Sequence, residues 1–170
     1  PWRRTPSQTP SLNPLLMSEL ISREALNPGV RKREVFGWAM YDFANSGYST
    51  VVITAVFAAY FVGGVAEGAA WATLAWTSGL SVSYLVVMLT MPGLGAWADR
   101  VAGKKRLLMW ATAGCVLSTA ALAVVGPGQV ALGLFILVVS NTFFSYGESL
   151  TASFLPELAK PEAMGRVSGW

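Results

Sequence analysis

Four long apolar stretches, joined by short connections, set the strictest limit on what this chain can fold into. They cover about residues 36–62, 70–98, 107–125 and 130–154. Each is close to the roughly 20 residues that an α-helix needs to cross about 30 Å of hydrocarbon. The stretches are apolar on every face rather than at alternate positions, which excludes membrane-spanning β-strands. The sequence therefore predicts an all-α membrane protein with four transmembrane helices within residues 35–155.

The composition agrees with this prediction. Hydrophobic residues make up 54% of the chain and charged residues only 12%, whereas a soluble domain carries about 25% charged residues. The chain has no His and a single Cys, Cys115, so it offers no imidazole ligands and no internal disulfide. We therefore expect a protein without a metal ion, cofactor or catalytic residues, and not an enzyme.

The Lys and Arg residues all fall on one side of the predicted membrane. They precede the first stretch, join the second to the third and follow the fourth, and the other two connections contain none. The positive-inside rule places this side in the cytoplasm. Residues 1–34, rich in Pro, are predicted to be a mostly disordered basic cytoplasmic tail, and residues 156–170 a cytoplasmic segment. The net charge of +3 is thus a sign of topology rather than of nucleic-acid binding. In a bacterium the membrane would be the plasma membrane.

Two acidic residues lie inside the predicted helices, Asp42 in the first and Glu148 in the fourth. An ionisable side chain at the centre of a bilayer costs at least about 2.5–3.5 kcal/mol on insertion scales. Such a residue normally faces other protein or a water-filled cavity, and it is a candidate for function.

Each acid shares a helix face with other polar residues, because residues three and four apart lie on the same side of a helix. The two stripes consist of Asp42, Asn45 and Ser49 in the first stretch and of Asn141, Ser145 and Glu148 in the fourth. Both acids lie roughly 9 Å from the cytoplasmic ends of their helices, so we expect the stripes to line one cavity for a solute or an ion. Two neighbouring carboxylates would also suit proton binding. Alternatively, the Asn and Ser side chains only join helices by hydrogen bonds.

The connection between the second and third stretches carries another pattern. Gly95 and Asp99 are spaced by four, and Arg100, Gly103, Lys104 and Lys105 follow. Gly95 would let another backbone approach, and Asp99 would accept hydrogen bonds or meet a helix N-terminus. A loop that only sets topology explains the cations, but not Gly95 together with Asp99. We therefore interpret these residues as a candidate cytoplasmic gate.

This connection resembles the cytoplasmic signature loop between the second and third helices of the major facilitator superfamily. The usual spacing puts the second Gly one residue closer to the Asp. The first stretch resembles the Tyr-Asp-x-Ala-Asn-Ser signature of the vacuolar amino-acid effluxer-like branch, in Tyr41, Asp42, Ala44, Asn45 and Ser46. Residues 154–157 and 166–169 are similar to the segment that follows helix four in that branch.

The resemblance implies the first part of a six-helix half of a twelve-helix transporter, with a fifth helix expected after residue 170. Such a protein would move amino acids or related solutes by alternating access, with protons as a candidate coupling ion. Its partners would be the lipid bilayer, a small solute and the remaining helices. Two alternatives stay open: a small dimeric four-helix exporter, and a four-helix scaffold or assembly subunit without transport activity.

Overall fold

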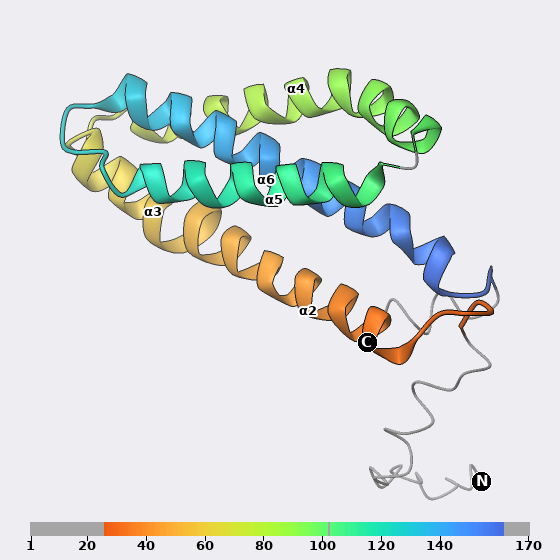
Figure 1. The fold of residues 1–170 in the computed structure, drawn as a ribbon. Helices are drawn as coiled ribbons and strands as arrows, with labels where there is room; N and C mark the ends of the chain where they lie inside the picture. The colour runs from red at the N-terminus through yellow and green to blue at the C-terminus, as the bar shows by residue number, and fades with distance from the viewer. Residues whose placement is uncertain (1–25, 102, 162–170) are drawn as a thin grey trace, which may run out of the picture. The chain divides into compact units, whose positions relative to one another are not determined.

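The structure is a computed structural model that describes residues 26–101 and 103–161. The predictions for residues 1–25 and 162–170 lie outside the described residues. The chain divides into two units, one of residues 1–36 with 155–170 and the other of residues 37–154. Within the described ranges every extended element of regular structure is helical (Figure 1), which confirms the prediction of an all-α protein.

Four helical segments follow one another along the chain. The first is built from α2 (Lys32–Tyr48), η2 (Ser49–Ala55), α3 (Val56–Tyr60) and η3 (Phe61–Val65), and the others are α4 (Ala72–Arg100), α5 (Lys104–Leu122) and α6 (Val130–Leu158). Three of the described helices are long and apolar enough to cross a membrane: Arg33–Val65, Ala72–Arg100 and Val130–Leu158.

The third predicted transmembrane helix, residues 107–125, corresponds to α5, which has 19 residues and is not among the helices that are long and apolar enough to cross a membrane. Its first turn consists of Lys104, Lys105 and Arg106, which lower its mean hydropathy and shorten its apolar part. The prediction of four membrane-spanning helices is therefore not confirmed in its exact count.

The first helix contains a stretch of wider, π-helical turns, η2, which the sequence pattern does not predict. Hydroxyl groups in this region donate to backbone carbonyls of preceding turns: Thr50 Oγ1 to Ser46 O at 3.1 Å and Thr54 Oγ1 to Ser49 O at 2.9 Å. Such bonds compete with the helical ladder and often bend a helix. The π-helical stretch begins at Ser49, which is also the last residue of the polar stripe of Asp42, Asn45 and Ser49.

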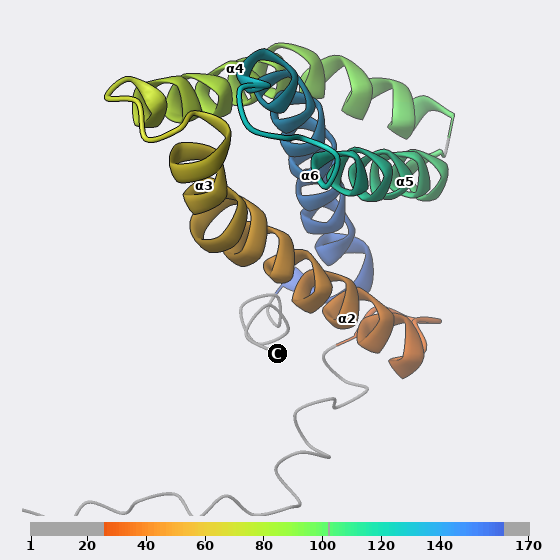
Figure 2. The same ribbon diagram turned by 90° about the vertical axis from the view of Figure 1, so that its left-hand side faces the viewer.

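Within the unit of residues 37–154, α6 is the central helix: it runs from α4 towards α2, with α3 on one side and α5 on the other (Figure 2). Ser140 on α6 accepts a hydrogen bond from Tyr48 on α2 at 2.9 Å and contacts Thr119 on α5 at 2.9 Å. The next residue, Asn141, donates to Ser83 on α4 at 2.6 Å. Two adjacent residues of α6 thus bind it to the three other helices.

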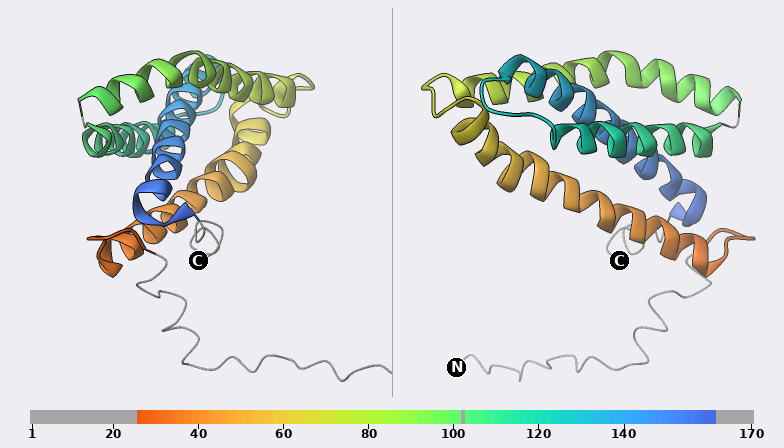
Figure 3. Two further views of the ribbon diagram at one scale, coloured as in Figure 1. Left: turned by 90° about the vertical axis from the view of Figure 1, so that its right-hand side faces the viewer. Right: turned by 60° about the vertical axis from the view of Figure 1, so that its left-hand side comes forward.

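The connection between η3 and α4 and the turn before α6 lie at one end of this bundle (Figure 3). The backbone N–H of Gly128 donates to Val65 O at 2.9 Å and joins the two. Gly128 has a φ of +77°, which a residue with a side chain rarely adopts. The tight turn expected from Gly-Pro-Gly at 126–128 is therefore present, closed by a bond from Gln129 N to Gly126 O at 3.2 Å.

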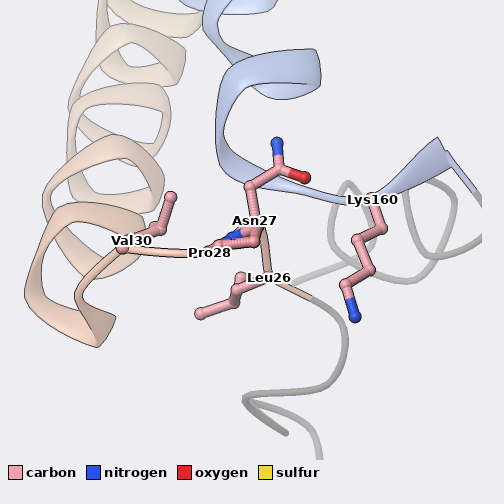
Figure 4. Close-up of a pocket in the computed structure, with 6 residues that line it drawn as sticks. Leu26, Asn27, Pro28, Val30 and Lys160 are labelled. Atoms are coloured by element: carbon pink, nitrogen blue, oxygen red, sulfur yellow. The ribbon is translucent and has the colours of Figure 1, made fainter.

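In the other unit, Asn27 caps the C-terminal end of α6. Its side-chain Nδ2 donates to Pro156 O at 3.0 Å and Glu157 O at 2.9 Å, and its backbone N–H donates to Leu158 O at 3.1 Å. The last carbonyls of a helix have no partner inside it, so one residue satisfies three of them. Figure 4 shows Asn27 beside the end of this helix. Residues 26–34, expected as part of a disordered tail, are therefore ordered in part by contacts with the end of α6.

We predict that Asn27→Ala lowers the free energy of unfolding of the chain by about 1–2 kcal/mol, because two side-chain hydrogen bonds are lost. Asn27→Asp should cost more than Asn27→Ala, since a carboxylate would face carbonyl oxygens at the negative end of the helix dipole. Thermal unfolding of the purified chain in detergent measures both. A smaller loss for Asn27→Asp than for Asn27→Ala would contradict the capping role.

Candidate functional site

Four of the six residues predicted to line a cavity do so. The cavity has a volume of about 260 Å³ and lies between α2, η2, α4 and α6. It is lined by Asp42, Asn45, Ser46, Ser49, Ile53, Tyr84, Phe144 and Glu148. The structure thus brings Asp42 and Glu148, which are more than 100 residues apart in the sequence, to the wall of one cavity.

The polar groups of the first helix reach this cavity because of their spacing. Asp42, Asn45 and Ser49 lie three and four residues apart and therefore on one face. The hydroxyl of Ser46 donates to Asp42 O at 3.1 Å, and that of Ser49 donates to Ser46 O at 3.0 Å. Both hydroxyl protons are used within the helix, so the two serines offer their remaining oxygen lone pairs to a ligand.

Two aromatic rings complete the wall. Phe144 comes from α6 and is 6% exposed, and its ring stacks on Tyr48 with a centroid distance of 4.5 Å. The hydroxyl of Tyr48 also bonds to Ser140, so the ring on which Phe144 stacks is itself fixed in position. Tyr84 comes from α4 and is half exposed. The cavity therefore combines acidic and amide groups with aromatic surface.

The charged side chains that line the cavity are all acidic. Among the described residues that line it, two are acidic and none is basic. Asp42 and Glu148 are both exposed, and neither forms an ion pair within the described part of the chain. The same part holds no group of three or more His, Cys, Asp or Glu side chains that would bind a metal ion. The cavity wall therefore presents negative charge and hydrogen-bonding groups.

The other two predicted residues do not line this cavity. Asn141 is fully buried and donates to Ser83, whose own hydroxyl donates to Leu80 O at 2.7 Å. Ser145, one turn further along α6, is also buried. For Asn141 the geometry is that of the alternative considered from the sequence, a hydrogen bond that joins two helices.

Sequence reasoning did not select four of the lining residues, Ser46, Ile53, Tyr84 and Phe144, as site residues. The sequence could have indicated Tyr84 as a site residue, because it follows Ser81 and Ser83 in the middle of an otherwise apolar stretch. Nothing in the sequence indicates Ile53 or Phe144 as site residues, because apolar residues on these helices are equally suited to face lipid or protein.

The residues of the predicted gate lie at the junction of α4 and α5 and do not line the cavity. Gly95, Asp99 and Arg100 belong to the last turns of α4. Gly103 precedes α5, and Lys104 and Lys105 begin it. Lys104 Nζ lies 3.1 Å from Asp99 Oδ1, so the ends of the two helices are joined by an ion pair.

Gly95 makes no close approach to the described part of the chain. A Cβ atom added there would meet nothing within 4 Å, and the same holds for Gly93 two residues earlier. The reason expected for Gly95, close approach of another backbone, therefore has no counterpart among the described residues.

The whole chain is similar to known membrane transporters. Residues 3–170 match the family model of the Major Facilitator Superfamily. An uncharacterized MFS-type transporter of Bacillus subtilis, YxiO, is 33% identical over 134 residues, which cover 77% of this chain and 31% of the relative. Another, YhhS of Escherichia coli K12, is 28% identical over 144 residues, covering 79% of this chain and 34% of the relative. No solved structure matches the chain.

The chain spans about a third of the length of these relatives. Its family model covers almost every residue, and its long apolar helices agree with a polytopic membrane protein. The chain therefore belongs to the major facilitator superfamily.

Proposed function

We propose that this chain is the N-terminal part of a secondary transporter that moves amino acids or related small solutes across a membrane by alternating access. The observation that carries the proposal is the cavity whose wall holds Asp42, Asn45 and Glu148. Two carboxylates on membrane-spanning helices are costly, and a water-filled route for a solute gives them a reason to be there. We also propose that the chain belongs to the vacuolar amino-acid effluxer-like branch.

The proposed roles differ between the residues. Asp42 and Glu148 bind and release a proton or a charged group of the solute, while Asn45 and Ser49 form hydrogen bonds with it. Asn141 holds α6 against α4 through its hydrogen bond to Ser83 instead of touching the solute, and Ser145 is buried outside the cavity wall. The rest of a twelve-helix fold would supply the second half against which this one rocks.

The orientation proposed here places the residues before α2, the α4–α5 connection and the residues after α6 in the cytoplasm, because all twelve Lys and Arg residues lie in these segments or in the helix turns next to them. Membership of a transporter family favours this proposal over the two alternatives, a four-helix scaffold and a small four-helix exporter.

The proposal is tested with the purified full-length protein in proteoliposomes. Uptake of labelled amino acids is measured with and without a proton gradient, against liposomes that lack the protein. We expect accumulation of at least one of them, and we expect the proton gradient to change its rate. If no amino acid or related solute enters faster than into the empty liposomes, the proposed function is wrong.

For the α4–α5 junction we predict that Gly95→Leu reduces transport several-fold while the protein reaches the membrane in normal amounts. A Cβ atom there meets nothing within 4 Å among the described residues, so we expect the leucine to clash with a part of the transporter outside them. Gly93→Leu is the matched control, because it lies in equally open space on another face of α4. Equal activity of the two variants would remove Gly95 from the gate.

Asp99→Asn gives a parallel prediction. The Asp99 side chain, which forms an ion pair with Lys104, is 64% exposed. Ion pairs between exposed side chains contribute little to stability. We therefore expect normal amounts of protein and a shift in the populations of the two access states. Cysteine accessibility in the cavity measures the shift, and wild-type accessibility with wild-type transport would leave the loop as a topology signal only.

A further inference from the structure

We propose that the solute carries a positive charge, and that its protonated amine or guanidinium group binds between Asp42 and Glu148. This inference rests on the proposed function and narrows its solute class from amino acids in general to cationic amino acids and amines. It follows from three properties of the cavity: its charge, its hydrogen-bonding groups and its aromatic wall.

The first property is charge. Asp42 and Glu148 line the cavity, and the sequence has no Lys or Arg between residues 34 and 99 or between 107 and 159, and no His anywhere. The cations of these helices are therefore confined to their ends, and neither acid forms an ion pair among the described residues. Unpaired carboxylates in a membrane are strongly disfavoured unless a positive charge or a proton reaches them. A cationic solute supplies that charge, and protons would compete with it for the same oxygens.

The second property is an excess of hydrogen-bond acceptors. The carboxylates accept only, and the hydroxyl protons of Ser46 and Ser49 are already donated to backbone carbonyls. Among the side chains that line the cavity, Asn45 and the hydroxyl of Tyr84 also bring donors, against the four oxygens of the two carboxylates. A surface of this kind complements a group that has donors and no acceptors. An ammonium has three such donors and a guanidinium five.

The third property is the aromatic wall formed by Tyr84 and Phe144. A cation within about 6 Å of an aromatic ring face is attracted to it, and the attraction grows when water is excluded. The rings also offer apolar surface to the carbon chain that carries the charged group. A solute without a net positive charge gains less from two carboxylates, because the repulsion of its own carboxylate offsets the attraction of its amine; neutral zwitterionic amino acids and acidic solutes are therefore disfavoured.

The test uses pairs of solutes of similar size that differ in charge. Arginine has a cationic guanidinium where citrulline has a neutral ureido group. Tyramine lacks the carboxylate of tyrosine and is therefore a cation, whereas tyrosine has no net charge. Binding to the purified full-length protein is measured by titration calorimetry, and uptake into proteoliposomes is measured separately. We expect arginine and tyramine to bind about tenfold tighter than citrulline and tyrosine.

Variants of Asp42 and Glu148 test whether these two acids cause the preference for cationic solutes. Asp42→Asn and Glu148→Gln should each reduce the ratio of arginine to citrulline affinity, and the double variant should abolish it. Glu67→Gln removes an exposed carboxylate outside the cavity wall and should leave the ratio unchanged. A ratio that survives the double variant would place cation binding elsewhere and overturn the inference.

The remaining outcomes separate the inference from the function. If wild-type protein binds and transports citrulline or tyrosine as well as their cationic partners, the inference is overturned and the proposed function stands. This would be the result if a basic residue outside the described helices neutralised the acids. If neither these four solutes nor any other amino acid is bound or moved, the proposed function and the inference both fall.

Discussion

Asp42→Asn and Glu148→Gln are each expected to lower the transport rate of the full-length protein about tenfold or more, with the amount of protein in the membrane close to wild type. The amide keeps the size of each side chain and most of its hydrogen bonds but removes its charge. Because both acids are exposed at the cavity wall and form no ion pair among the described residues, their replacement should not weaken the fold. Uptake into vesicles and immunoblotting of the membranes measure the two quantities.

Glu67→Gln serves as the control for this pair. Glu67 lies in the connection between η3 and α4 and is exposed, so it loses the same charge without touching the cavity. Full activity of both cavity variants, with a pH dependence like that of wild type, would assign Asp42 and Glu148 to helix packing.

The second large effect is expected at the contact between α5 and α6. A Cβ atom at Gly114 would lie 2.7 Å from Phe143 Cδ1 and 2.8 Å from two further atoms of the same ring. The contact includes the inner edge of the ring and not only its far end, so the clash cannot be relieved by a small movement. We predict that Gly114→Ala lowers the free energy of unfolding by about 1–3 kcal/mol, as overpacking of a core does.

Two further variants make this prediction specific. Gly93→Ala adds the same methyl group to α4 where nothing lies within 4 Å, and it should leave the thermal midpoint unchanged or raise it slightly. Phe143→Leu, combined with Gly114→Ala, should restore part of the lost stability because it removes the ring. Equal midpoints for Gly114→Ala and Gly93→Ala would contradict the close packing of α5 on α6.

The helical character of the chain and part of its site could be predicted from the sequence because they depend on local periodicity. The stripe of Asp42, Asn45 and Ser49 follows directly from the helical repeat, and it does face a cavity. The same periodicity on α6 was less informative. Asn141 and Glu148 lie two turns apart, but only Glu148 reaches the cavity, since α6 is the central helix and different positions along it meet different neighbours.

Features that depend on distant partners could not be predicted in this way. The capping of α6 by Asn27 joins residues about 130 positions apart, and nothing in the local sequence of either segment indicates it. Tyr84 contributes to the cavity only because α4 is rotated to present it there. The π-helical turns at Ser49–Ala55 reflect bonds between hydroxyls and the backbone rather than any hydrophobic pattern.

The central claim, that the cavity containing Asp42 and Glu148 is the route of the solute, is tested most directly by cysteine accessibility. Asn45→Cys is made in a Cys115→Ala background of the full-length protein and exposed to a membrane-impermeant thiol reagent in right-side-out and inside-out vesicles. A route that opens alternately predicts labelling from both sides, slowed in each case by a transported solute, whereas labelling of Glu67→Cys, an exposed position outside the cavity wall, should be insensitive to the solute. Labelling of Asn45→Cys from one side only, with a rate that no solute changes, would contradict the account.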